Sequence, residues 1–342
     1  MRWTSVFLLA FLITWIYACR NNTAVKSNSE VKYKHPSYVP SILIPEDNQP
    51  TTARIELGRR LFYDKRLSRN ETQNCASCHA LSSAFTDGKK TSTGAHGKPG
   101  KRNAPTLANL AWSKAFMAEG GVPSLEMQVL APIQDTIEMD MPLPEAAERL
   151  RKDPILNQLS QEAYQRDLDE YVIVRAIACF ERSFISFDTR FDRWYYQKDE
   201  SAFTNSEKNG KAIFFSEKAA CAKCHTLPLF TDGDFYNIGL YKTYEDAGRE
   251  RVTYDKADNG KFKTPTLRNI ELTAPYMHDG SIATLEEVIE LYNKGGENHP
   301  AKDFRVRSLE LTQGQKEDLL AFLKTLTDWN FVQNHTLLSL EQ

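Results

Sequence analysis

The sequence lacks the features that mark several classes of protein. Its 43 basic and 45 acidic residues give a formal net charge of −2, so charge offers no support for binding nucleic acid or an anionic membrane surface. Six cysteines in 342 residues are too few for a disulfide scaffold. No stretch keeps the apolar-polar alternation of a β-strand, and the apolar spacing instead predicts a mainly α-helical fold.

A long apolar run occurs only at the beginning of the chain. It extends from Val6 to Tyr17 behind a positive residue, Arg2, and is shorter than the roughly 20 residues of a membrane-spanning helix. We therefore expect residues 1–18 to be a signal peptide for export to the periplasm. The run ends in Ile-Tyr-Ala-Cys, which resembles a bacterial lipobox, so we expect Cys19 to carry a lipid that anchors the protein to a membrane. Ordinary cleavage beside an incidental cysteine is the alternative.

An internal repeat divides the rest of the chain. Ala104–Leu110 matches Thr264–Ile270 at an offset of 264 − 104 = 160, and Phe116–Gly120 matches Tyr276–Gly280 at the same offset. One module therefore occurs twice. The predicted organisation is a polar tether at residues 19–50, an N-terminal domain at 51–200 and a C-terminal domain at 201–335.

Helical signals occur in both halves. Ala53–Phe62 is predicted to be amphipathic, and Glu170–Trp194, which has neither Gly nor Pro, is predicted to be one long helix that buries Cys179 as an inert thiol. Capping boxes predict three further helix starts, at Thr204 with Glu207, Thr284 with Glu287, and Thr312 with Gln315.

Each half carries one C-x-x-C-H motif, formed by Cys75, Cys78 and His79 and by Cys221, Cys224 and His225. Two thiols at this spacing bond to the two vinyl groups of one haem, and the next residue turns its imidazole onto the iron. A zinc site would need two C-x-x-C pairs close together, whereas 142 residues (221 − 78 − 1) separate these. We predict two covalent c-type haems with His79 and His225 as axial ligands.

The sequence around these motifs resembles the bacterial di-haem cytochrome c peroxidase family, which includes the MauG enzymes. The resemblance runs from about residue 56 to 326 and is carried by Leu57–Asp64, Arg102–Thr106 and Ala274–Gly280. It implies two cytochrome-c-like helical domains, with a peroxide-reacting haem in the first and an electron-storing haem in the second. It further implies that a small cytochrome c or cupredoxin supplies electrons to reduce hydrogen peroxide. Family members commonly dimerise, so a homodimer is a further expectation.

The resemblance also assigns roles to single residues. Tyr292, fourteen residues after His278, is the implied sixth ligand of the second haem, where the defining peroxidases have methionine and MauG has tyrosine. The equivalent residue of the first half is Pro132, which has no side-chain atom for iron, so an open site is expected there. Glu138 matches the distal glutamate that moves a proton between the peroxide oxygens, and Gln128 matches a polar residue of the same pocket.

The resemblance implies two further metal contacts, one to the iron of the first haem and one to a calcium ion. His96 stands where the defining peroxidases have a histidine that ligates the first haem at rest and leaves on activation. MauG lacks this ligand, so an exposed loop histidine is the alternative. One Ca²⁺ between the haems is implied, bound by the Asn103 side chain and by the backbone carbonyls of Thr273 and Pro275, which are oxygen donors of the kind Ca²⁺ prefers.

One residue departs from the family pattern. Ala118 stands where the family has a tryptophan between the haems, and an aliphatic side chain cannot carry an electron hole. Electrons must then tunnel directly or use another aromatic residue, with Trp112 as a candidate.

Three functions stay open. Peroxidase activity is the leading hypothesis, and oxidation of aromatic residues in a protein substrate, as in MauG, is favoured by Tyr292 and opposed by Ala118 and His96. A plain electron-transfer cytochrome, with six-coordinate haems that ignore peroxide and cyanide, is the third.

Overall fold

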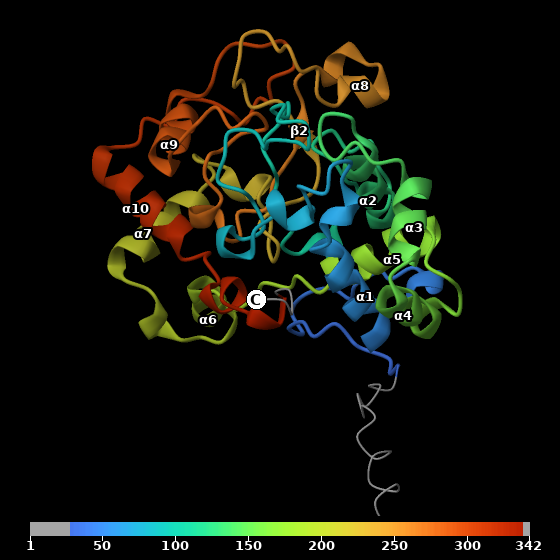
Figure 1. The fold of residues 1–342 in the computed structure, drawn as a ribbon. Coiled ribbons are helices and arrows are strands. Elements are labelled where there is room, and N and C mark those ends of the chain that lie inside the picture. Colours follow the sequence, from blue (N-terminus) through green and yellow to red (C-terminus); the bar gives the residue numbers. More distant parts are fainter. Residues whose placement is uncertain (1–27, 338–342) are drawn as a thin grey trace, which may run out of the picture.

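The computed structural model describes residues 28–337 and is mainly helical (Figure 1). The N-terminal half contains α1 (Thr52–Phe62), α2 (Leu125–Gln134), α3 (Leu143–Arg151), α4 (Pro154–Tyr164) and α5 (Glu170–Glu181). The C-terminal half contains α6 (Arg190–Tyr196), α7 (Asn205–Phe214), α8 (Glu250–Thr253), α9 (Leu285–Lys294), α10 (Gln313–Lys324) and α11 (Trp329–Val332). Strands β1 (Phe235–Tyr236) and β2 (Phe262–Lys263) form a short antiparallel pair. The predicted fold class is confirmed.

Each half is built around one close crossing of two helices. A Cβ atom on Gly58 of α1 would lie 1.9 Å from the Ala176 carbonyl oxygen of α5. A Cβ on Gly210 of α7 would lie equally close, 1.9 Å, to the Asp318 carbonyl oxygen of α10. Only glycine lets the two backbones approach this far. Figure 1 shows α7 lying along α10, and the repeat seen in the sequence is therefore a repeat of architecture.

The helix termini follow the sequence signals. The side chains of Thr204, Thr284 and Thr312 each accept a hydrogen bond from the backbone N–H three residues on. The side chain of that third residue in turn accepts a hydrogen bond from the backbone N–H of the threonine. These are the three predicted capping boxes, and they satisfy N–H groups that a helix start leaves unpaired. The helix α9 ends at Gly295, whose φ of +84° suits glycine.

The predicted long helix at 170–194 is wrong, because the chain leaves the helix after Arg182 and begins a second one at Arg190. Between them, the Asn109 side chain accepts from the Ser186 N–H at 2.9 Å and donates to the Ser186 carbonyl at 3.0 Å. The Asp328 carboxylate accepts from the Asp188 N–H at 3.0 Å. These tertiary bonds replace the helical ones, and apolar spacing cannot reveal them.

The predicted tether at 19–50 also needs correction for its described part. The Tyr33 side chain is buried, and its hydroxyl donates to the Cys179 carbonyl at 2.7 Å. Asn48 is fully buried and donates to Glu126 at 2.7 Å. Residues 28–50 therefore belong to the N-terminal domain. The signal peptide at 1–18, Cys19 and the tether up to residue 27 lie outside the described residues.

The two hydrophobic cores do not divide at the predicted domain boundary. Phe191 of α6 packs in the second core, its ring centroid 4.9 Å from that of Phe230, although it precedes residue 201. Conversely, Phe331, Val332 and Leu337 pack in the first core. In residues 28–337, no helix combines the length and the apolar character needed to cross a membrane.

Candidate di-haem site

A single cavity contacts both C-x-x-C-H motifs. Its volume is about 1840 Å³, and its lining includes Cys75, Cys78 and His79 from the first half and Cys221, Cys224 and His225 from the second. Ordinary small-molecule sites have volumes of roughly 300–1000 Å³. The cavity is therefore large enough for more than one such ligand, as two haems require.

The two motifs have the same local structure. Cys75–Ser77 and Cys221–Lys223 each form one turn of 3-10 helix. The His79 N–H donates to the Cys75 carbonyl at 3.0 Å, and the His225 N–H donates to the Cys221 carbonyl at 2.9 Å. The turn sets both thiols and the imidazole against the cavity. None of the five cysteines in the described part of the chain forms a disulfide, so the four motif cysteines are not tied to one another.

The two histidines are held in the tautomer that iron needs. Nδ1 of His79 lies 2.9 Å from the Phe85 carbonyl oxygen, and Nδ1 of His225 lies 3.0 Å from that of Phe230. A carbonyl oxygen only accepts, so Nδ1 carries the proton and Nε2 keeps its lone pair. Burial lowers the pKa of both imidazoles, which keeps them neutral. The residues present therefore fit two c-type haems.

In the first half, α2 and the loop after it build the other wall of the cavity. Gln128 and Pro132, four residues apart on one face of α2, both line it. The chain then folds back, and the Met139 N–H donates to the Pro132 carbonyl at 3.2 Å. This return brings Glu138 to the cavity lining.

Glu138 has the electrostatics of a proton-transfer group. Its side chain is accessible from the cavity, while the protein on its other sides desolvates it. Burial, followed by the charge of Asp135, raises the pKa of the Glu138 carboxyl. The carboxyl therefore exchanges a proton nearer to neutral pH than an ordinary glutamate does.

In the second half, Tyr292 on α9 takes the place of Pro132. It lines the cavity near the second motif, and burial, with smaller contributions from Cys221 and Cys224, raises its pKa. The first half has no hydroxyl at the equivalent position, because Pro132 stands there. The two sides of the cavity therefore differ: a tyrosine hydroxyl lines it near the second motif, and a proline stands at the equivalent position of the first half.

The comparisons with known proteins agree with this arrangement. Residues 52–201 match the family model described as di-haem cytochrome c peroxidase, and residues 207–327 match that of cytochrome c. The methylamine utilization protein MauG of Methylorubrum extorquens is 36% identical over 326 residues, 93% of this chain and 91% of that protein. This chain belongs to the di-haem cytochrome c peroxidase family.

Two further relatives show the breadth of the family. Cytochrome c551 peroxidase of Nitrosomonas europaea is 35% identical over 279 residues, 80% of this chain and 79% of that protein. The crystal structure of a MauG-like protein associated with microbial copper homeostasis is 37% identical, with a TM-score of 0.84 over 88% of this chain and 97% of that one. The di-haem family thus includes relatives named for peroxidase activity and relatives named MauG.

His96 lies outside the cavity lining of this di-haem protein. Its Nε2 is 2.8 Å from Asp140 Oδ2, and its side chain is 42% exposed. Its loop nevertheless contacts the catalytic candidate, since the Ala95 N–H donates to the Glu138 carbonyl at 2.7 Å. Ligation of the first haem by His96 stays a prediction.

The three residues expected to bind calcium all line the cavity. The Asn103 amide nitrogen donates to the Lys89 carbonyl at 2.8 Å, which leaves its oxygen for a cation, and the Asn103 N–H donates to the His278 carbonyl at 2.9 Å. No group of three or more His, Cys, Asp or Glu in residues 28–337 suits a metal ion. A calcium site of amide and backbone oxygens, with Thr273 and Pro275, stays a prediction.

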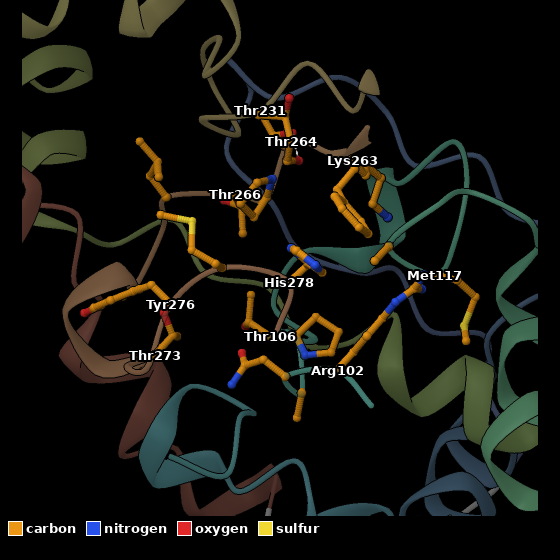
Figure 2. A pocket seen from close by; sticks show the side chains of 18 of the residues that line it. Arg102, Thr106, Met117, Thr231, Lys263, Thr264, Thr266, Thr273, Tyr276 and His278 are labelled. Atoms are coloured by element: carbon orange, nitrogen blue, oxygen red, sulfur yellow. Dashed lines mark hydrogen bonds between the residues drawn. The ribbon is translucent and has the colours of Figure 1, made fainter. Parts of the chain in front are cut away.

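Several charged residues between the halves were not singled out by sequence reasoning. Arg102 pairs with Asp246 at 2.7 Å and also with Glu119, while the Lys263 ammonium donates to the Ala115 carbonyl at 2.7 Å. Burial lowers the pKa of Lys263 to about 8. Figure 2 shows Arg102, Lys263 and His278 among the side chains of the cavity. Arg102 and His278 stand in irregular loops and Lys263 in the two-residue strand β2, so no periodicity in the sequence marks them.

Backbone contact joins the halves at Ala118, the position of the family tryptophan. The Ala118 carbonyl accepts from the Lys263 N–H at 2.8 Å. Trp112, the candidate for an alternative electron path, also lines the cavity, and its indole N–H donates to the Pro40 carbonyl at 2.7 Å.

Glu181 is a second residue that sequence reasoning missed. It lines the cavity and is buried, and its Oε2 has no hydrogen-bond partner within the described part of the chain. Burial raises the pKa of this carboxyl to about 8. An unpaired buried polar atom at a cavity wall indicates that the wall is completed by another group, which is consistent with a haem site.

Proposed function

We propose that this protein is a di-haem cytochrome c peroxidase. Hydrogen peroxide takes up two electrons and two protons and leaves as two water molecules, and two molecules of a small cytochrome c or cupredoxin each lose one electron. The single observation that carries the proposal is the asymmetry of the cavity. Glu138 and Pro132 line its first side, whereas Tyr292 lines its second.

The residues would divide the work as follows. His79 and His225 hold the two irons, and the haems, when bound, supply the redox chemistry. Glu138 takes a proton from one peroxide oxygen and returns it to the other, which turns the departing oxygen into water. Gln128, on the same wall, orients the peroxide by hydrogen bonding. Tyr292 would occupy the sixth position of the second iron, so that peroxide can reach only the first.

A stopped-flow assay of the haem-loaded protein with peroxide and a reduced mono-haem cytochrome c tests this function. Rapid oxidation of two donors per peroxide is expected. Glu138→Gln should lower turnover by about 10²- to 10⁴-fold, because the amide cannot relay the proton. Glu145→Gln, which neutralises an exposed carboxylate on α3, is the matched control. Unchanged turnover in Glu138→Gln would contradict the assignment.

A MauG-like oxidation of aromatic residues in a protein substrate is the second candidate. Tyr292 favours it, because a tyrosine ligand stabilises ferric iron and disfavours storage of an electron from a high-potential donor. Sequence identity of 36% to the MauG of Methylorubrum extorquens is consistent with it. A fast spectral change with peroxide alone, without oxidation of any donor, would favour this candidate over the peroxidase.

Location in the periplasm, with a lipid on Cys19, belongs to the same proposal. Covalent haem attachment fits an exported protein, and residues 1–19 have the pattern of a lipoprotein signal. Mass spectrometry of the mature N-terminus tests it. Cys19→Ala should release the protein from the membrane fraction, and a soluble wild-type protein would overturn lipidation.

A further inference from the structure

We propose that the electron donor is an acidic protein and that it docks on one basic surface beside the second haem motif. This surface, called the basic rim below, consists of Lys242, Lys294, Lys302, Phe304 and Arg307. The identity of the partner as an electron donor rests on the proposed peroxidase function. The position of the surface and the sign of its charge rest on the structure.

The basic rim adjoins the part of the cavity that contains the second motif. Its residues line a surface pocket of about 610 Å³, and two residues, Val306 and Arg307, line both this pocket and the large cavity. One layer of side chains therefore separates the pocket from the cavity. Electron tunnelling weakens with distance, so a donor seated here would have a short path to a haem at Cys221 and Cys224.

The neighbours of Phe304 support this placement. Asp303 and Arg305, on either side of it in the chain, both line the large cavity. The Arg305 guanidinium lies over the Tyr236 ring, 4.5 Å from its centroid, and the Tyr236 hydroxyl donates to Asp232 at 2.9 Å. The Asp232 N–H in turn donates to the Cys224 carbonyl at 2.8 Å. The loop that presents Phe304 to solvent is thus the loop that covers the second haem motif.

The charge of the rim is opposite to that of the whole chain. The lining of its pocket holds four cationic side chains and one carboxylate, Glu297, for a local charge of +3 (4 − 1). The formal net charge of the chain is −2. The side chains of Lys242 and Lys294 are 76% and 73% exposed, and their nearest carboxylate contacts are long, at 3.7 and 3.5 Å. Exposed pairs of this kind hold the side chains only weakly, so both ammonium groups are accessible to the carboxylates of a partner.

Phe304 supplies an apolar contact within this positive surface. Its side chain is 87% exposed, and among the large apolar and aromatic side chains of residues 28–337 only Leu43 and Tyr254 are more exposed. Protein interfaces commonly combine a central aromatic residue, which gains by losing contact with water, with charged residues at the rim that steer the partner. The matching partner is a small one-electron protein with carboxylates around the exposed edge of its cofactor.

Two variants, which carry three substitutions between them, test the basic rim in the haem-loaded protein. Lys242→Glu with Lys294→Glu reverses two of its charges, and Phe304→Ala removes the apolar contact. Tyr254→Ala and Lys256→Glu are matched controls, because Tyr254 is 88% exposed and Lys256 is equally accessible at 91%. Both follow α8, which lies well away from α9 in Figure 1. Reduction by dithionite, followed by the visible spectrum, verifies that each variant holds both haems.

The probes are two reduced mono-haem cytochromes c, one with an acidic and one with a basic surface around the haem edge. We expect kcat/KM for the acidic probe to exceed that for the basic probe and to fall as salt rises. The double reversal should lower kcat/KM for the acidic probe at least tenfold, with kcat at saturation changed less. Phe304→Ala should lower it as well. The two controls should match the wild-type protein.

Binding of the oxidised acidic cytochrome, measured by NMR line broadening at low salt, separates the two proposals. Salt-sensitive binding that the double reversal abolishes, without donor oxidation, would contradict the peroxidase and keep the docking surface. Donor oxidation that is indifferent to all three substitutions would overturn the docking surface and keep the peroxidase. Self-association, or binding to anionic lipid vesicles, that is lost in the same variants while the acidic cytochrome is unaffected would also overturn it.

Discussion

Asn109 and Asn269, which occupy equivalent positions in the two repeats, both hydrogen-bond to Ser186. Asn109 binds its backbone N–H and carbonyl, and the Asn269 amide donates to its hydroxyl at 3.0 Å. Both asparagines are in the left-handed region, with φ of +60° and +63°. The segment between α5 and α6 is thereby held by both halves at once.

Loss of this link should destabilise the protein. Asn269→Ala removes the bond to Ser186 and also leaves the buried Asp328 N–H without the side chain that accepts from it at 2.8 Å. We expect a loss of about 1–3 kcal/mol in the free energy of unfolding, measured by urea denaturation. Asn298→Ala, at an exposed position outside this link, should change it by less than about 0.5 kcal/mol. Equal effects of the two substitutions would contradict the role of the link.

The helix crossing of the C-terminal half gives a second prediction. In Gly210→Ala, the new methyl group overlaps the Asp318 carbonyl oxygen, so α7 and α10 must separate, and we expect the midpoint of thermal unfolding to fall sharply. At Gly314, a Cβ meets nothing within 4 Å. Gly314→Ala should therefore stabilise α10, by about 0.5–1 kcal/mol. A tolerated Gly210→Ala would show that the crossing is looser than described.

Glu181 should make stability depend on pH. Its pKa is raised from 4.5 to about 8, mainly by burial, so the folded protein holds this proton more firmly than the unfolded chain does. The stabilisation is full below about pH 4.5 and is lost as pH rises to about 8. Glu181→Gln should remove this decline and be more stable than wild type at pH 8, by urea denaturation. Parallel curves for the two proteins would contradict a buried, protonated Glu181.

Spectroscopy can decide the ligand of the second iron. If Tyr292 binds it, the ferric protein should show resonance Raman bands of an iron phenolate. Tyr292→Phe should abolish them and leave the first haem unchanged. Tyr254→Phe, at an exposed tyrosine, is the control. Bands that persist in Tyr292→Phe would assign the ligand to another residue.

The local features of the chain follow its sequence closely. The three capping boxes and the helix at Thr52–Phe62 depend on neighbours within four residues, so the printed sequence is enough to predict them. The two haem motifs are likewise local, because five consecutive residues supply both thiols and the imidazole. The repeat at an offset of 160 then predicted two similar domains.

The errors arose where a partner distant in the chain decides the conformation. The helix predicted at 170–194 is interrupted by Asn109 and Asp328, and the predicted tether is held by contacts such as Tyr33 with Cys179. The spacing of apolar residues indicates which face of a segment is apolar. It does not indicate which distant residues will contact that face or hydrogen-bond to its backbone.

By itself, the sequence determined the covalent chemistry: where the haems attach, which histidines follow them, and that the same module occurs twice. Those properties are carried by contiguous residues. Only the tertiary structure decided that both motifs open onto one cavity, that Glu138 and Tyr292 line it beside different motifs, and that Glu181 is buried there without a partner. These are relations between distant segments, and they are set by packing and by the satisfaction of buried hydrogen bonds.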